Sequence, residues 1–151
     1  MPFAYLALKF VHIVLAIVAI GANITYGVWI ARAKKHPAFA ATALRGVKFI
    51  DDRMANPAYL LMLPTGALMV WLAGYSFATR WIAWAMALWL VAVLLGYLGY
   101  TPALASEIRA IDSDGPDSPA AAAASRRGGI FAAILAVVVV GIVVLMVFKP
   151  A

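Results

Sequence analysis

Four segments of this chain are each longer than twenty residues and contain no lysine, arginine, aspartate or glutamate: 10–31, 54–79, 81–106 and 128–148. A helix needs about 20 apolar residues to cross the hydrocarbon core of a bilayer. Hydrophobic residues make up 66% of the 151 residues and charged residues 12%, whereas a soluble domain carries roughly 25% charged residues. The pattern predicts a single integral membrane domain over residues 1–151, an all-α four-helix bundle in the lipid bilayer.

Turn and charge signals set the expected span boundaries. We expect the spans at about 3–30, 56–76, 80–105 and 128–148, with loops at 31–55 and 106–127. Residues 112–125 are polar and then alanine-rich, which predicts a flexible connection.

Apolar residues recur at helical spacing in the first loop, at Phe39, Ala43, Val47 and Ile50. Because the charged residues around them lie off that line, we expect a short amphipathic helix at the membrane surface, between spans one and two.

The cations gather in the two longer loops. They are Arg32, Lys34, Lys35, Arg45, Lys48 and Arg53 in the first, and Arg109, Arg126 and Arg127 in the second. By the positive-inside rule, we expect both loops to face the cytoplasm and both termini to lie on the outer side of the membrane. The net charge of +6 then reflects juxtamembrane cations, and no nucleic acid partner is expected. The chain has no cysteine, which excludes thiolate nucleophiles and iron–sulfur clusters.

The first span carries polar residues on one face. Lys9 and His12 are one helical turn apart, and Asn23 returns to nearly the same angle three turns later. His12 is a candidate axial ligand to b-type haem, or else a histidine that hydrogen-bonds a neighbouring helix. Lys9 is a candidate partner for a haem propionate, or a lysine that snorkels to the headgroups. Asn23 is a candidate contact to a bound group, or a link between helices.

Arg53 follows two aspartates at the cytoplasmic mouth of the second span. It either belongs to a solvated ion-pair cluster or holds an anionic group such as a carboxylate. The second axial ligand is open, because His36 lies in a loop and the span methionines are only weak candidates. A five-coordinate haem, or a haem shared within a homo-oligomer, would need only one histidine from each chain.

The motifs resemble the DUF2269 family of predicted bacterial integral membrane proteins up to about Pro102. They are Lys9-x-x-His12, Gly21, Asp52-Arg53-Met54-x-x-Pro57, Pro64-Thr65-Gly66 and Trp81. The opening Lys-x-x-His is also similar to HemJ-type protoporphyrinogen oxidases and, more distantly, to CopD-like four-helix membrane proteins. The HemJ resemblance implies a haem-binding bundle with His12 as metal ligand and Lys9 and Arg53 as polar partners. HemJ-type proteins carry a further lysine after the tryptophan, which is absent from residues 81–86 here.

The sequence leaves three alternative functions to be tested. The first is a haem-dependent membrane oxidoreductase or electron carrier, with a redox partner or quinone, acting on a lipophilic substrate such as a porphyrinogen or quinol. The second is a non-catalytic membrane subunit or scaffold without cofactor. The third, a proton-coupled transporter, needs an acid within the membrane, and we place all six aspartates and glutamates in loops or at span ends.

Overall fold

Helices account for nearly all of residues 3–150, the part of the chain that the computed structural model describes. In chain order they are α1 (Phe3–Lys35), α2 (Pro37–Ile50), the π-helical segment η1 (Asp51–Ala55), α3 (Asn56–Leu72), α4 (Arg80–Leu95), the π-helical segment η2 (Gly96–Tyr100), α5 (Thr101–Asp114) and α6 (Pro119–Phe148).

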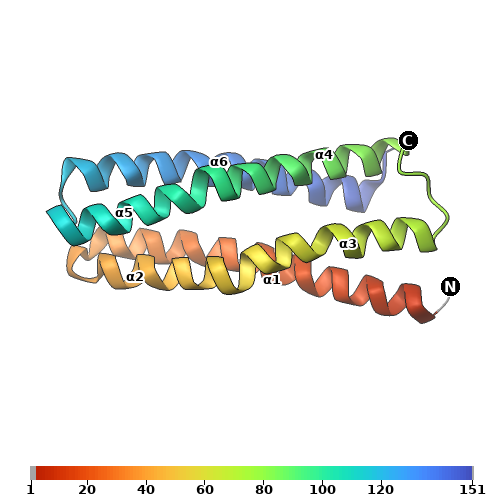
Figure 1. Cartoon of the computed structure of the whole chain (residues 1–151), viewed down its shortest axis with the longest axis horizontal. Helices are drawn as coiled ribbons and strands as arrows, with labels where there is room; N and C mark the ends of the chain where they lie inside the picture. Colours follow the sequence, from red (N-terminus) through yellow and green to blue (C-terminus); the bar gives the residue numbers. More distant parts are fainter. Residues whose placement is uncertain (1–2, 151) are drawn as a thin grey trace.

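These elements form four long antiparallel rods, with both termini at the same end of the molecule (Figure 1). The rods are α1, α2–η1–α3, α4–η2–α5 and α6, and each is long and apolar enough to cross a membrane. Large apolar side chains cover the outside; Leu98, for example, is 72% exposed. The prediction of an all-α, four-helix membrane fold is confirmed.

A proline explains why each of the two middle rods contains a π-helical segment. Pro57 and Pro102 have no N–H to donate to the preceding turn. The residue before each proline instead bonds five residues back, from Asn56 N–H to the Asp51 carbonyl and from Thr101 N–H to the Gly96 carbonyl. One extra residue in the turn therefore lets the rod continue past its proline, and such π bulges are frequent at functional sites.

The turn between α3 and α4 and the turn between α5 and α6 lie at opposite ends of the bundle. Their helix ends are capped in different ways. Gly74 adopts φ +71°, and its N–H and that of Tyr75 bond the carbonyls of Trp71 and Val70, which is the Schellman pattern. At the other end, Ser118 caps α6 by accepting a hydrogen bond from the Ala121 N–H at 3.2 Å.

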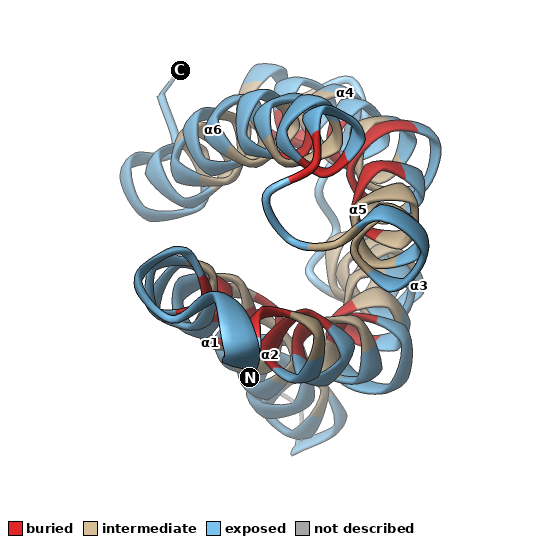
Figure 2. Cartoon of the chain, turned by 90° about the vertical axis from the view of Figure 1, so that its left-hand side faces the viewer, coloured by how far each residue is buried: buried red, intermediate tan, exposed pale blue. Residues whose placement is uncertain are grey.

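Packing within the bundle leaves one side open. α1 packs along α2 and α3, and α6 packs along α4 and α5. The end-on view in Figure 2 shows a ring of helices that does not close between α1 and α6. The largest core cluster sits where α1, α2, η1 and the α4–η2–α5 rod meet, around Tyr26, Leu44, Val47, Tyr100 and Leu104.

The loops expected at 31–55 and 106–127 are mostly helical in the structure. α1 ends at Lys35 before Pro37, as Pro37 predicts, but the second rod begins at once and runs to Leu72. The flexible connection expected at 112–125 is reduced to residues 115–118.

The amphipathic helix forms over Pro37–Ile50, but it does not lie apart from the bundle. It buries Ala40, Ala43, Leu44 and Val47, packs on α1 and α5, and continues into the second rod.

Candidate functional site

His12 is held by a hydrogen bond to the second rod. Its Nδ1 lies 2.8 Å from the hydroxyl oxygen of Thr65. That hydroxyl lies 2.7 Å from the backbone carbonyl of Leu61, to which it donates its only proton. Since the Thr65 proton is directed to a backbone carbonyl, we assign the Thr65 oxygen as the acceptor of the bond from His12, with the ring proton on Nδ1 and a lone pair on Nε2. Within residues 3–150, Nε2 has no hydrogen-bond partner.

Gly66 allows the imidazole to lie against α3. A Cβ added at residue 66 would lie 3.2 Å from Cε1 of His12, closer than ordinary van der Waals contact. The Pro64-Thr65-Gly66 motif thus supplies both the hydrogen-bond partner of His12 and the space beside its ring.

The ring of His12 borders a cavity of about 350 Å³, which we call the His12 cavity. This volume is within the range of small-molecule pockets. Its wall combines two lysines and four methionines with aromatic and aliphatic side chains; the lysines and methionines are Lys9, Lys149, Met62, Met69, Met86 and Met146. Among residues 3–150, no three histidine, aspartate or glutamate side chains gather as a metal site, and His12 is the one histidine that lines this cavity.

The four predicted site residues do not form one group. Lys9 and His12 line the same cavity. Asn23 lies about 16 Å further along α1, at 1.5 Å per residue, and donates hydrogen bonds to the Ala19 carbonyl at 2.8 Å and the Tyr59 hydroxyl at 3.1 Å. Arg53 is exposed and lines neither the His12 cavity nor the one beside Asn23.

Asp51 is the polar residue that the sequence reasoning missed. It is only 5% exposed, inside the bundle rather than at a solvated span end. Its Oδ2 accepts hydrogen bonds from the Thr101 hydroxyl at 2.9 Å and from Asn56 Nδ2 at 3.3 Å. We expected all six acidic residues in loops or at span ends; Asp51 instead lies within the second rod, where η1 places its carboxyl group inside the bundle.

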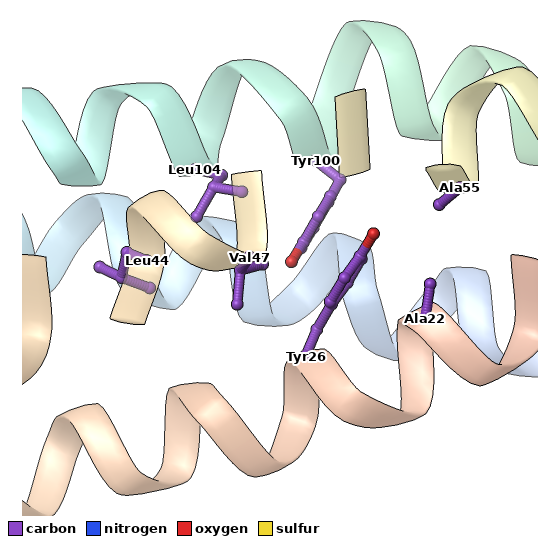
Figure 3. Close-up of a cluster of buried hydrophobic side chains, with 7 residues drawn as sticks. All are labelled: Ala22, Tyr26, Leu44, Val47, Ala55, Tyr100 and Leu104. Atoms are coloured by element: carbon purple, nitrogen blue, oxygen red, sulfur yellow. The ribbon is translucent and has the colours of Figure 1, made fainter. Parts of the chain in front are cut away.

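Asp51 borders a second cavity, of about 430 Å³, which we call the Asp51 cavity. Asn23, Tyr26, Tyr59 and Tyr100 also line it. Figure 3 shows Tyr26 rising from α1 and Tyr100 descending from the opposite rod, so that the two rings lie side by side. Their centroids are 6.3 Å apart and their planes nearly parallel, at 5°.

Three comparisons with known proteins were informative about the family of the chain. No curated protein and no solved structure shows significant similarity to the chain. The model of a family described as predicted integral membrane protein (DUF2269) matches residues 6–150, which include every residue of both cavities except Tyr5. The chain therefore belongs to the DUF2269 family of predicted integral membrane proteins.

Proposed function

We propose that this membrane protein binds b-type haem through Nε2 of His12 and serves electron transfer or the oxidation of a lipophilic substrate. The observation that carries the proposal is the chain of hydrogen bonds from His12 Nδ1 to Thr65 and on to the Leu61 carbonyl. Metal-binding histidines characteristically donate their other ring N–H in this way, which fixes the tautomer and the ring orientation. The similarity of Lys9-x-x-His12 to the opening of HemJ-type proteins supports the same assignment.

The other residues of the His12 cavity fit a haem chemically. Lys9 and Lys149 place two cations on a largely apolar wall, where they would pair with the propionate carboxylates. Four methionines line the same wall, and a methionine thioether is an established partner of histidine at haem iron. Haem, when bound, supplies one-electron chemistry; the chain's residues orient the ligand, neutralise its carboxylates and exclude water.

An absorption spectrum tests the proposal directly. The protein is expressed with haem precursor, purified in detergent, and measured as a reduced-minus-oxidised difference. We expect a Soret band that His12→Ala abolishes and that His36→Ala retains, because His36 is exposed and lines neither the His12 nor the Asp51 cavity. A wild-type protein without a Soret band after haem addition, or an undiminished band in His12→Ala, overturns the proposal and favours the cofactor-free subunit.

Orientation in the bacterial cytoplasmic membrane is part of the proposal. The end of the bundle where α1 meets α2 carries Arg32, Lys34 and Lys35, and the positive-inside rule places that end in the cytoplasm. The His12 cavity would then lie toward the outer side, where both termini end.

A further inference from the structure

The carboxyl group of Asp51 is buried without a cation. It forms no ion pair with any residue from 3 to 150, and the nearby Lys48 pairs instead with the exposed Asp52 at 2.7 Å. Both hydrogen bonds to Asp51 reach Oδ2, so Oδ1 accepts none among the described residues. Because an unpaired buried carboxylate is strongly unfavourable, the carboxyl group either keeps its proton or meets a positive partner at Oδ1.

Two tyrosines at the Asp51 cavity also lack hydrogen bonds. Tyr26 is 3% exposed and Tyr100 6% exposed, and neither buried hydroxyl has a hydrogen-bond partner within the described chain. A buried hydroxyl left without a partner is costly and calls for an explanation such as a missing ligand. Both residues line the cavity that Asp51 lines.

The remaining wall indicates the charge and shape of that ligand. Among residues 3–150, no lysine, arginine or histidine lines the Asp51 cavity, and Asp51 is the one acidic residue that does. Four tyrosines line it, and aromatic faces attract cations. Aliphatic side chains of α1 and α6 complete the wall, and these are the two rods between which the ring of helices is open (Figure 2).

We propose that the Asp51 cavity binds a primary ammonium cation with an apolar body. The ammonium group has three N–H donors, and the acceptors without a described partner at this cavity are Asp51 Oδ1 and the hydroxyl oxygens of Tyr26 and Tyr100. The apolar body lies against the aliphatic wall and enters from the bilayer between α1 and α6. The cavity shares no lining residue with the His12 cavity, so the site is independent of haem.

Equilibrium dialysis of the full chain in lipid nanodiscs tests the site, with radiolabelled 2-phenylethylammonium as the probe. We expect saturable binding at one site per chain, weakened tenfold or more by Asp51→Asn, since a charge-assisted hydrogen bond is lost. Asn keeps an oxygen for Thr101 and Asn56. The matched control is Asp52→Asn, which removes the same charge one residue away from an exposed position and leaves binding unchanged.

Two further measurements distinguish binding at this site from nonspecific uptake of the probe. Tyr100→Phe removes a hydroxyl that has no hydrogen-bond partner among the described residues, so the variant should still fold and should bind the probe several-fold more weakly. Uncharged 2-phenylethanol, which lacks the ammonium group, should compete poorly with the probe. The proposal is overturned if wild-type binding is not saturable, if Asp51→Asn and Tyr100→Phe both bind like wild type, if Asp52→Asn loses as much as Asp51→Asn, or if uncharged 2-phenylethanol competes equally well.

Discussion

The carboxyl group of Asp51 accepts a hydrogen bond from the hydroxyl of Thr101 at 2.9 Å, and this bond joins the start of η1 in one middle rod to the residue that follows η2 in the other. Thr101→Val keeps the shape of the side chain but removes the donor. Asp51 Oδ2 then retains only the longer bond from Asn56, at 3.3 Å. We expect a loss of about 1–3 kcal/mol in unfolding free energy, measured by denaturation in detergent.

Thr42→Val is the control for that substitution. Thr42 is exposed on α2, and its hydroxyl bonds no described residue, so the same chemical change should leave stability nearly unaltered. Equal stability of Thr101→Val and Thr42→Val would contradict a structural role for the Asp51–Thr101 bond.

Gly99 is required by the close approach of η2 to α6. A Cβ at residue 99 would lie 2.5 Å from ring carbons of Phe131, so Gly99→Ala forces the ring or the helices to move. We expect a loss of about 1–3 kcal/mol, the usual cost of overpacking. The control is Gly96→Ala, one turn earlier in the same segment, where a Cβ meets nothing within 4 Å. Partial recovery of Gly99→Ala by Phe131→Leu would identify the ring as the cause.

The four spans could be predicted because long uncharged segments have few structural alternatives, but the burial of Asp51 was missed. Its neighbours Asp52 and Arg53 favoured a solvated cluster, and the apolar face of α2 was predicted through Phe39, Ala43, Val47 and Ile50. Of these, Ala43 and Val47 are buried, whereas Phe39 is exposed, and the buried face also includes Leu44. Asp51 lies seven and four residues beyond Leu44 and Val47, which is the spacing of one helix face and the signal that was present in the sequence.

The surroundings of His12 could be predicted only in part. Its place on a polar face of α1 with Lys9 follows from spacing along one helix, and both residues line the same cavity. Its contact with Thr65 spans 53 positions and depends on how α1 and α3 slide past each other. That register is set by side-chain packing between rods, which periodicity within one rod does not determine.

Gly66 provides a test of the His12 geometry that leaves the histidine itself in place. Gly66→Ala puts a methyl group 3.2 Å from Cε1 and should displace the imidazole from Thr65. If His12 holds haem, we expect a weaker and shifted Soret band in the purified protein. Gly21→Ala on α1, where a Cβ meets nothing within 4 Å, should leave the spectrum unchanged; the same spectrum from both variants would argue against the proposed ligand.

The tyrosines of the Asp51 cavity should respond differently to the loss of a hydroxyl. Tyr26→Phe removes a buried group without a partner, so in amine-free buffer stability should stay the same or rise by up to about 1 kcal/mol. Tyr59→Phe removes the acceptor of the 3.1 Å bond from Asn23 and should destabilise by about 1 kcal/mol. Melting temperatures of the two variants in the same detergent check which is less stable. If Tyr26→Phe loses more stability than Tyr59→Phe, the Tyr26 hydroxyl has a hydrogen-bond partner.

The orientation can be measured by cysteine labelling, because the chain contains no cysteine of its own. Ser113→Cys places a thiol near the end of α5, and Ala78→Cys places one in the turn between α3 and α4; both positions are exposed and lie at opposite ends of the bundle. If the cation-rich end faces the cytoplasm, an impermeant maleimide added to intact cells lacking an outer membrane should label Ala78→Cys and spare Ser113→Cys until the membrane is opened. The reverse pattern would place the His12 cavity toward the cytoplasm and the basic connections outside.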